Sequence, residues 1–325
     1  MLHLLDLAHH KAHDAVKRGG PVYVLVNPVE FHGPHLSLHN DRLLSLGLTR
    51  LLHARLSPPD APLLLLDDVE IGMDPAPGRG TRHHSFATVR AIILETCRAL
   101  LELEPQGVIF MTFHGAPMHA AALQAGVEFL RGKGVAAVNP FNAVLQEMLE
   151  FKDPSRYREA YAYLPEQDAA QMLQTLNQDF HAGFFETSMA LHLAPQSVSD
   201  IHLRLPPCPA VVPDGPLLQA ARAAALLGRF SLARDLRFAA YGLGWQRVRP
   251  FPGYTGHPAR ASAASGAVFT RAILDLYVPL VRAVLAGTQP PPRPIMPWIP
   301  ALTLQGRIPH QALPGPADMA APPLS

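Results

Sequence analysis

The sequence predicts an α/β fold in which a mostly parallel central sheet is covered by helices on both faces. Three observations carry this prediction. Short apolar runs alternate with longer helical patterns, the first run lies between Gly-Pro and Asn-Pro pairs, and 325 residues are enough to bury a sizeable core. Because strands that alternate with helices form parallel sheets, the repeated pattern places helices above and below one sheet.

Apolar runs predict the strands. Val22–Val26 stands between Gly20-Pro21 and Asn27-Pro28, which is typical of a buried strand. Three further runs predict strands of the same kind, and a later run that contains glycines is a weaker candidate. These runs are Leu63–Leu66, Val108–Phe113 and Val135–Val138, with Phe238–Trp245 as the later candidate.

Helical spacing of apolar residues predicts the elements between the strands. Leucines recur through the second helical segment, and Pro117 suits the first turn of the fourth. The predicted helices cover residues 4–17, 41–56, 85–103, 117–131 and 259–286.

Two segments lie outside this alternation. Residues 151–178 are polar and aromatic, and we expect an insertion that overhangs a site. Residues 288–325 are rich in proline and poor in charge, which is typical of an extended arm or tail. We therefore expect one domain over residues 1–287, followed by this arm.

The composition excludes several classes of partner. Lysine and arginine number 27 and aspartate and glutamate number 26, so the formal net charge of +1 argues against nucleic acid or an anionic membrane as a partner. A charged fraction of 16%, below the roughly 25% of soluble domains, suggests a homo-oligomer. Two cysteines form no disulfide framework, and neither a signal peptide nor a transmembrane span is expected, so we expect a cytoplasmic protein.

The segment after the first strand, residues 27–41, is rich in groups that bind metals. Glu30 and His32 are two residues apart, so an extended backbone puts both side chains on one side. Asp41 begins a helix from which its carboxylate can turn back to the same pocket. Mixed imidazole and carboxylate donors suit zinc, manganese or iron. The structural alternative is a helix cap at Asp41 and ordinary loop histidines at His32 and His35.

Two further clusters follow later in the chain. His114 stands at the end of the third strand, where open α/β sheets place their ligands. His181 precedes Glu186 by five residues within an apolar stretch, so a buried Glu186 needs a partner or a metal. His181 has the ordinary pKa of a general acid or base. A structural histidine and a glutamate favoured by the helix dipole are the alternative.

At these residues the sequence resembles the creatininase (creatinine amidohydrolase) family. The family's Glu-x-His-Gly-x-His-Leu-Pro motif stands at residues 30–37 with Ser37 in place of proline, and Asp41 follows. His-Ala-Gly-x-x-Glu-Thr-Ser is complete at residues 181–188. The family's Asn-Gly-His-Gly-Gly-Asn motif is altered to Thr-Phe-His-Gly-Ala-Pro at residues 112–117.

The resemblance implies a three-layer αβα fold, often assembled as a homohexamer of cytosolic subunits, and a site with two divalent metal ions. Its ligands would be Glu30, His32, Asp41, His114 and Glu186, with Asp41 bridging the ions and His181 as the proton shuttle. Creatininase itself takes a carboxylate ligand two residues after the histidine of its second motif. Ala116 stands there, so Glu186 must serve instead.

The function predicted from this site is hydrolysis of an amide, cyclic amide or formamide C–N bond of a small molecule by a metal-activated water. One alternative is another two-metal hydrolase, a peptidase or a phosphoesterase. The phosphoesterase needs basic residues near the site, for which Arg79 and Arg82 are candidates. The other alternative is a catalytically degenerate family member that binds a small molecule, which the altered second motif favours.

Overall fold

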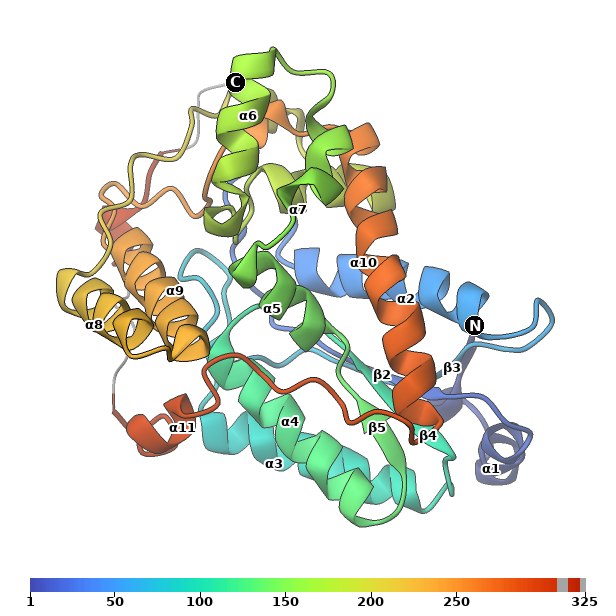
Figure 1. Ribbon diagram of the computed structural model, residues 1–325. Helices are drawn as coiled ribbons and strands as arrows, with labels where there is room; N and C mark the ends of the chain where they lie inside the picture. The colour runs from blue at the N-terminus through green and yellow to red at the C-terminus, as the bar shows by residue number, and fades with distance from the viewer. Residues whose placement is uncertain (309–314, 322–325) are drawn as a thin grey trace.

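A parallel sheet lies at the centre of the described chain, residues 1–308 and 315–321 of this computed structural model (Figure 1). Its strand order is β1-β3-β2-β4-β5, and all neighbouring pairs are parallel. The strands are β1 (Leu2–His3), β2 (Val22–Val26), β3 (Leu64–Val69), β4 (Gly107–Met111) and β5 (Ala136–Val138). The four main predicted strands overlap β2 to β5, and of these only β2 has the predicted bounds.

Strand β2 is buried on both faces, as the sequence pattern predicts. Tyr23 and Leu25 belong to the hydrophobic core on one side of the sheet. Val22, Val24 and Val26 belong to the core on the other side. Because successive side chains of a strand point to opposite faces, an apolar run of this kind is stable only between two layers of helices.

Helices form those two layers, which confirms the three-layer αβα prediction. One face is covered mainly by α2 (Asn40–Leu56), α5 (Phe141–Glu150), α7 (Phe184–Leu193) and α10 (Ala263–Leu285). The other face is covered by α1 (His9–Lys17), α3 (Phe86–Leu101) and α4 (Pro117–Gly132). Figure 1 shows α3 and α4 on the opposite side of the sheet from α2 and α10.

Smaller elements surround these layers. Helices α8 (Gly215–Leu226) and α9 (Phe230–Gln246) pack together as a hairpin at one side of the molecule, and α6 (Glu166–Gln174) and α11 (Ile299–Leu302) complete the described α-helices (Figure 1). Short 3-10 helices cover Leu4–Asp6, Pro154–Tyr161, Leu176–Gln178, Pro195–Ser197, Asp200–Arg204, Pro258–Arg260 and Pro316–Asp318.

Two element predictions were wrong. Phe238–Trp245 is not a strand but the C-terminal half of α9. Its bulky residues Phe238, Tyr241 and Trp245 recur at three- and four-residue intervals, which is the helical period. Gly244 fits there because a Cβ would meet the Val212 carbonyl at 2.3 Å. The observed N-terminal α-helix is also shorter than the predicted helix at residues 4–17. Leu4–Asp6 form a separate 3-10 helix, Leu7 is extended, and α1 begins only at His9.

The arm after residue 287 packs on the domain in its described part. Ile295 is fully buried and Met296 is 3% exposed. Further along, Phe251 pairs with Met319 through backbone hydrogen bonds. Residues 309–314 and 322–325 of the predicted arm lie outside the described residues, and the division of the chain at residue 287 stays a prediction. Within the described chain, no helix combines the length and apolar character that crossing a bilayer requires.

Candidate metal centre

The carboxyl ends of two neighbouring strands bring the first groups of the site together. Strands β2 and β4 are hydrogen-bonded neighbours, so the loops that follow them leave the sheet side by side. Glu30 and His32 lie in the loop after β2, and His114 lies just beyond β4. The Glu30 amide donates to the Leu38 carbonyl at 3.0 Å, which folds this loop back on itself.

Two helices add carboxylates to the same place. Asp41 and Glu186 stand in the first turns of α2 and α7. The N-terminus of a helix favours negative charge, which lowers the cost of burying these groups. Glu186 Oε2 also accepts a hydrogen bond from the Ala182 amide at 2.6 Å, which fixes the carboxylate toward the site.

Asp41 occupies the middle of the cluster. Its Oδ1 lies 3.0 Å from His32 Nε2, and its Oδ2 lies 3.4 Å from His114 Nδ1. On either side, Glu30 Oε2 lies 2.8 Å from His114 Nδ1, and Glu186 Oε2 lies 3.7 Å from His32 Nε2. The two oxygens of Asp41 therefore face two different sets of potential ligands.

Three sets of three side chains each bring their ligand atoms within 4.8 Å of one another. The sets are Glu30, Asp41 and His114; His32, Asp41 and Glu186; and Glu30, His32 and His181. The first two share Asp41. The residues predicted as metal ligands thus form one cluster, and each of the three sets could hold a metal ion.

Every member of the cluster is buried, and the buried charges control its protonation. Burial alone would lower the pKa of His32, but Asp41 and the other carboxylates raise it to about 10. Burial likewise opposes a charged His114, but Glu30 and Asp41 hold its pKa well above the ordinary value. Burial raises the pKa of Glu186 to about 8. The buried carboxylates therefore favour the protonated, positively charged form of both histidines.

The donors fit metal cations. Glu30 Oε2, His32 Nε2 and Asp41 Oδ2 are buried, and the polar atoms nearest to them belong to other members of the cluster. Carboxylate oxygens and imidazole nitrogens that converge in this way are the usual ligands of zinc and similar cations. His32 Nδ1 lies 3.1 Å from the Glu30 carbonyl, and His114 Nε2 lies 2.8 Å from the Met73 carbonyl. These contacts leave the other nitrogen of each ring facing the carboxylates, as in many metal sites.

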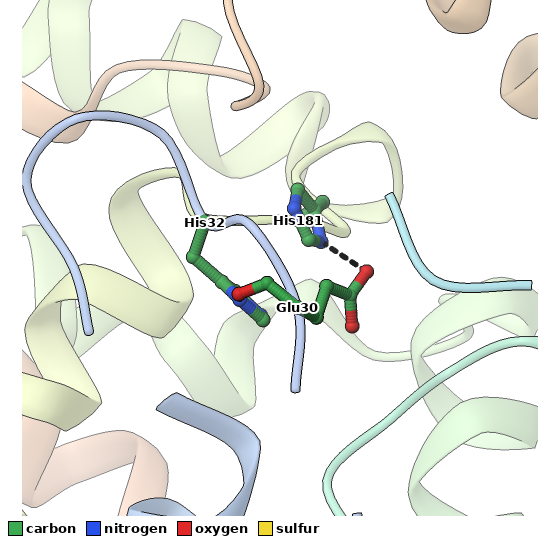
Figure 2. Close-up of side chains that lie close together, drawn as sticks. All are labelled: Glu30, His32 and His181. Carbon is green, nitrogen blue, oxygen red and sulfur yellow. Dashed lines mark hydrogen bonds and ion pairs between the residues drawn. The ribbon is translucent and has the colours of Figure 1, made fainter. Parts of the chain in front are cut away.

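His181 lies beside the cluster, and Figure 2 shows its side chain close to those of Glu30 and His32. Its ring stacks on His32 with the ring centroids 4.3 Å apart, and its Nε2 lies 2.9 Å from the Phe31 carbonyl. A proton on Nε2 donates to this carbonyl, so Nδ1 is the free acceptor, 3.7 Å from Glu30 Oε1. Burial lowers the pKa of His181 to about 4, with the His32 charge adding to the effect.

The turn before α7 explains how His181 and Glu186 share one site. Ala182 has φ of +46°, a left-handed conformation that costs energy for a residue with a side chain. Gly183 follows against Asp179, so close that a Cβ would lie 1.7 Å from Asp179 Oδ1. Asp179 in turn accepts from the Phe185 amide at 3.0 Å and fixes the start of α7.

Comparison with known families agrees with this geometry. The model of the creatininase family, described as creatinine amidohydrolase, matches residues 6–281. The chain belongs to the creatininase family. A search of curated proteins found no match.

Solved creatininase structures are similar to this creatininase-family chain in fold. A mutant creatininase of the Zn-Zn type matches with a TM-score of 0.56 and 18% identity, over 89% of this chain and 100% of the other. Creatininase with manganese matches with a TM-score of 0.54 and 18% identity, over 88% of this chain and 98% of the other. A further crystal structure, of creatinine amidohydrolase, matches with a TM-score of 0.55 and 19% identity, over 88% of this chain and 97% of the other.

Other residues of the motif segments lie outside the cluster in this creatininase-family protein. His35 is buried, and its Nε2 lies 2.8 Å from Thr187 Oγ1. His39 is partly exposed and pairs with Glu70. Arg82 is exposed and pairs with Glu70 as well. His35 therefore supports α7, and His39 and Arg82 belong to the surface.

A cavity of about 360 Å³ opens onto the cluster, and most of its walls were not predicted. Helix α9, assigned wrongly from the sequence, contributes Phe238 and Trp245, and the arm contributes Met296 and Trp298. Of the predicted insertion at residues 151–178, only Asn177 lines the cavity. Tyr157 and Tyr161 of that segment pack in the core instead.

Proposed function

We propose that this protein is a metal-dependent amidohydrolase that hydrolyses a C–N bond of a small molecule with a water activated by two divalent cations. The observation that carries the proposal is Asp41, which belongs to two sets of potential ligands at once. A carboxylate shared by two such sets can bridge two ions, which suits hydrolases with two metals. Membership of the creatininase family supports amide chemistry, and zinc and manganese creatininases are structural neighbours.

The ligand roles follow the two sets. Glu30, His114 and Asp41 would hold one ion, and His32, Glu186 and Asp41 would hold the other. Zinc, manganese or iron suits this mixture of imidazole and carboxylate donors. Such cations, when bound, would lower the pKa of a water and polarise the carbonyl group of the substrate.

His181 acts as the proton carrier in this proposal. Its lowered pKa keeps the imidazole neutral at neutral pH, so Nδ1 can take a proton released at the cluster. The Phe31 carbonyl holds the ring through Nε2 and so keeps Nδ1 directed at the site. His181 then delivers the proton to the leaving nitrogen of the amide.

The walls of the cavity favour an amide over a phosphate ester. Neither lysine nor arginine is among the described residues that line the cavity. A phosphate group is normally bound by such cations.

The altered second motif still keeps His114 in the cluster. The changed residue Pro117 occupies the first position of α4, where proline is well tolerated, so it does not disturb the helix.

The purified protein tests this function directly. We expect bound divalent metal, and hydrolysis of at least one compound from a panel of linear amides, formamides and creatinine. A chelator abolishes that activity and added metal restores it. Protein that binds no metal would support a degenerate binding protein instead. Hydrolysis of phosphate esters without hydrolysis of amides would support a phosphoesterase.

We also propose a cytoplasmic homo-oligomer, a hexamer by analogy with the family. Large apolar side chains on the α8–α9 hairpin support an interface between subunits, since Leu226 is 88% exposed and Phe230 is 72% exposed. Light scattering on the native protein and on a Leu226→Lys, Phe230→Lys variant tests this. A native monomer would contradict the proposal.

A further inference from the structure

The cavity beside the metal cluster has walls that are almost entirely apolar. The charged groups among its lining are the members of the cluster and Asp74. The remaining walls come mainly from α5, α9 and the arm, and include Phe141, Leu145, Phe238, Leu243, Trp298 and Leu302. Its volume of about 360 Å³ is more than twice the roughly 150 Å³ of an engineered apolar cavity that holds benzene. A substrate that fills this space has a large apolar part.

The arm closes one side of the cavity and is fixed there. The Met296 amide donates to Asp235 Oδ2 of α9 at 2.9 Å. Asp235 is 2% exposed, and Arg234 holds its other oxygen from two nitrogens, at 2.8 and 3.0 Å. Asn142 of α5 donates to the Pro292 carbonyl at 3.3 Å. Figure 1 shows the arm running from the end of α10 past α4 to α11, which lies below the α8–α9 hairpin.

This wall lies outside the segment that the family match covers. The match to the creatininase family ends at residue 281, so Met296, Trp298 and Leu302 lie beyond it. The arm therefore adds wall to the cavity from outside the matched segment. Trp298 and Asn177 both line this cavity. Trp298 Nε1 and Asn177 Oδ1 are buried without a hydrogen bond among the described residues.

We propose that the substrate is a neutral amide whose apolar group is as large as one or two aromatic rings, and that the arm around Trp298 selects it. This proposal rests on the amide hydrolysis proposed above. The apolar group fills the space between α5, α9 and the arm, while the amide reaches the metal cluster. A carboxylate on that group is rejected, because no described lysine or arginine of the lining pairs with it and its burial is costly.

A series of primary amides tests this selection in the metal-loaded enzyme. The compounds are acetamide, phenylacetamide, 1-naphthylacetamide and 4-carboxyphenylacetamide. We expect kcat/KM for phenylacetamide to exceed that for acetamide by about tenfold or more, and the added carboxylate to reverse the gain. Hydrolysis of acetamide with no gain from the ring would overturn the inference and leave the proposed function standing.

Two exposed leucines of the arm provide a matched pair of variants. Leu302 lines the cavity and Leu304 does not, although they are 66% and 59% exposed and lie two residues apart. We expect Leu302→Lys to lower the ratio of phenylacetamide to acetamide activity by about tenfold, and Leu304→Lys to leave the ratio unchanged. Trp298→Ala is a second variant with the same expected loss. An unchanged ratio in both cavity variants would contradict the role of the arm.

Binding can be measured without turnover. The chain contains two tryptophans, Trp245 and Trp298, and both line the cavity. Phenylacetamide added to the His181→Ala variant should therefore change the tryptophan fluorescence saturably, and acetamide should not. No change with phenylacetamide would overturn the inference. A saturable change in a protein that hydrolyses no amide would support the apolar cavity while contradicting the proposed function.

Discussion

The indole ring of Trp245 lies against the imidazole of His181, with the two ring centroids 5.1 Å apart. Trp245 Nε1 donates to the Tyr254 carbonyl at 3.0 Å, so the indole is fixed in place. The same tryptophan lines the cavity. This contact joins the apolar wall to the proposed proton carrier and removes water from one side of its ring. That burial is the main reason why the pKa of His181 is lowered to about 4.

Replacing His181 by alanine should slow catalysis without removing metal. The residue contributes a proton transfer, which is worth about 10²- to 10⁴-fold in rate. The ligand sets centred on Asp41 are formed without it. We expect kcat to fall by that factor while metal content, measured by mass spectrometry, stays at the wild-type value.

His257→Ala is the control for this experiment. His257 is half-buried and lines a separate cavity with Asp168 and Arg260, so both metal content and kcat should be unchanged. Because His181 also forms a set with Glu30 and His32, loss of metal from His181→Ala would make it a ligand rather than a proton carrier.

Asp41→Asn should lose both metal ions. The amide keeps the shape of the side chain but removes the charge shared by the two ligand sets. Asp67→Asn, in β3 and outside the cluster, removes a carboxylate without touching the site. We expect metal analysis to find little metal in the first variant and wild-type content in the second. Two ions retained by Asp41→Asn would disprove the bridging role.

The cluster itself was predictable because its residues occupy positions that sequence patterns identify. Glu30 and His114 follow strands with clear boundaries, and the ends of adjacent parallel strands must meet. Asp41 and Glu186 begin helices, where acidic residues are expected anyway. In the structure their side chains are only 1% and 5% exposed, which distinguishes them from ordinary helix caps. This burial arises from tertiary packing, so the local sequence could not predict it.

The walls of the cavity were not predictable in the same way. Trp298 reaches the site through an arm held by Asp235 and Asn142, and local sequence carries no signal for such distant hydrogen bonds. The apolar run at residues 238–245 was predicted as a strand, and its glycines did not distinguish a strand from a helix because glycine weakens both. In the structure Gly244 permits close packing of α9 against Val212. The reason for this glycine therefore lies in a segment more than thirty residues away, and the local sequence does not reveal it.

Metal binding should release protons. The pKa of His32 is raised to about 10, that of His114 lies well above its ordinary value, and that of Glu186 is about 8. All three groups therefore carry protons in chelated protein at pH 7 and must lose them to become ligands. Calorimetric titration with zinc in buffers of different ionisation enthalpy should show release of more than one proton per protein. Proton release near zero would contradict the ligand roles.

Chelated protein should lose stability as pH rises. The pKa of His32 is about 10 when folded and 6.5 ordinarily, so its stabilising effect is full below pH 6.5 and disappears toward pH 10. Folding raises the pKa of Glu186 from 4.5 to about 8, so this group also makes the folded state less stable as the pH rises from 4.5 to about 8. We expect a lower Tm at pH 9 than at pH 6.5 in chelator, and a smaller difference with saturating metal. Equal Tm values in chelator would contradict this.

Gly183→Ala should destabilise the protein and weaken metal binding together. An added Cβ would lie 1.7 Å from Asp179 Oδ1 and 2.5 Å from the Thr255 carbonyl, which belongs to the backbone and cannot rotate away. Overpacking of this kind costs about 1–3 kcal/mol or more, and the resulting shift of α7 carries Glu186 out of position. Gly215→Ala is the matched control at a helix start, because no atom lies within 4 Å of its added Cβ. Thermal unfolding and metal analysis of both variants check the prediction, and a Gly183→Ala protein with wild-type Tm and metal content would show that the close packing at the start of α7 is dispensable.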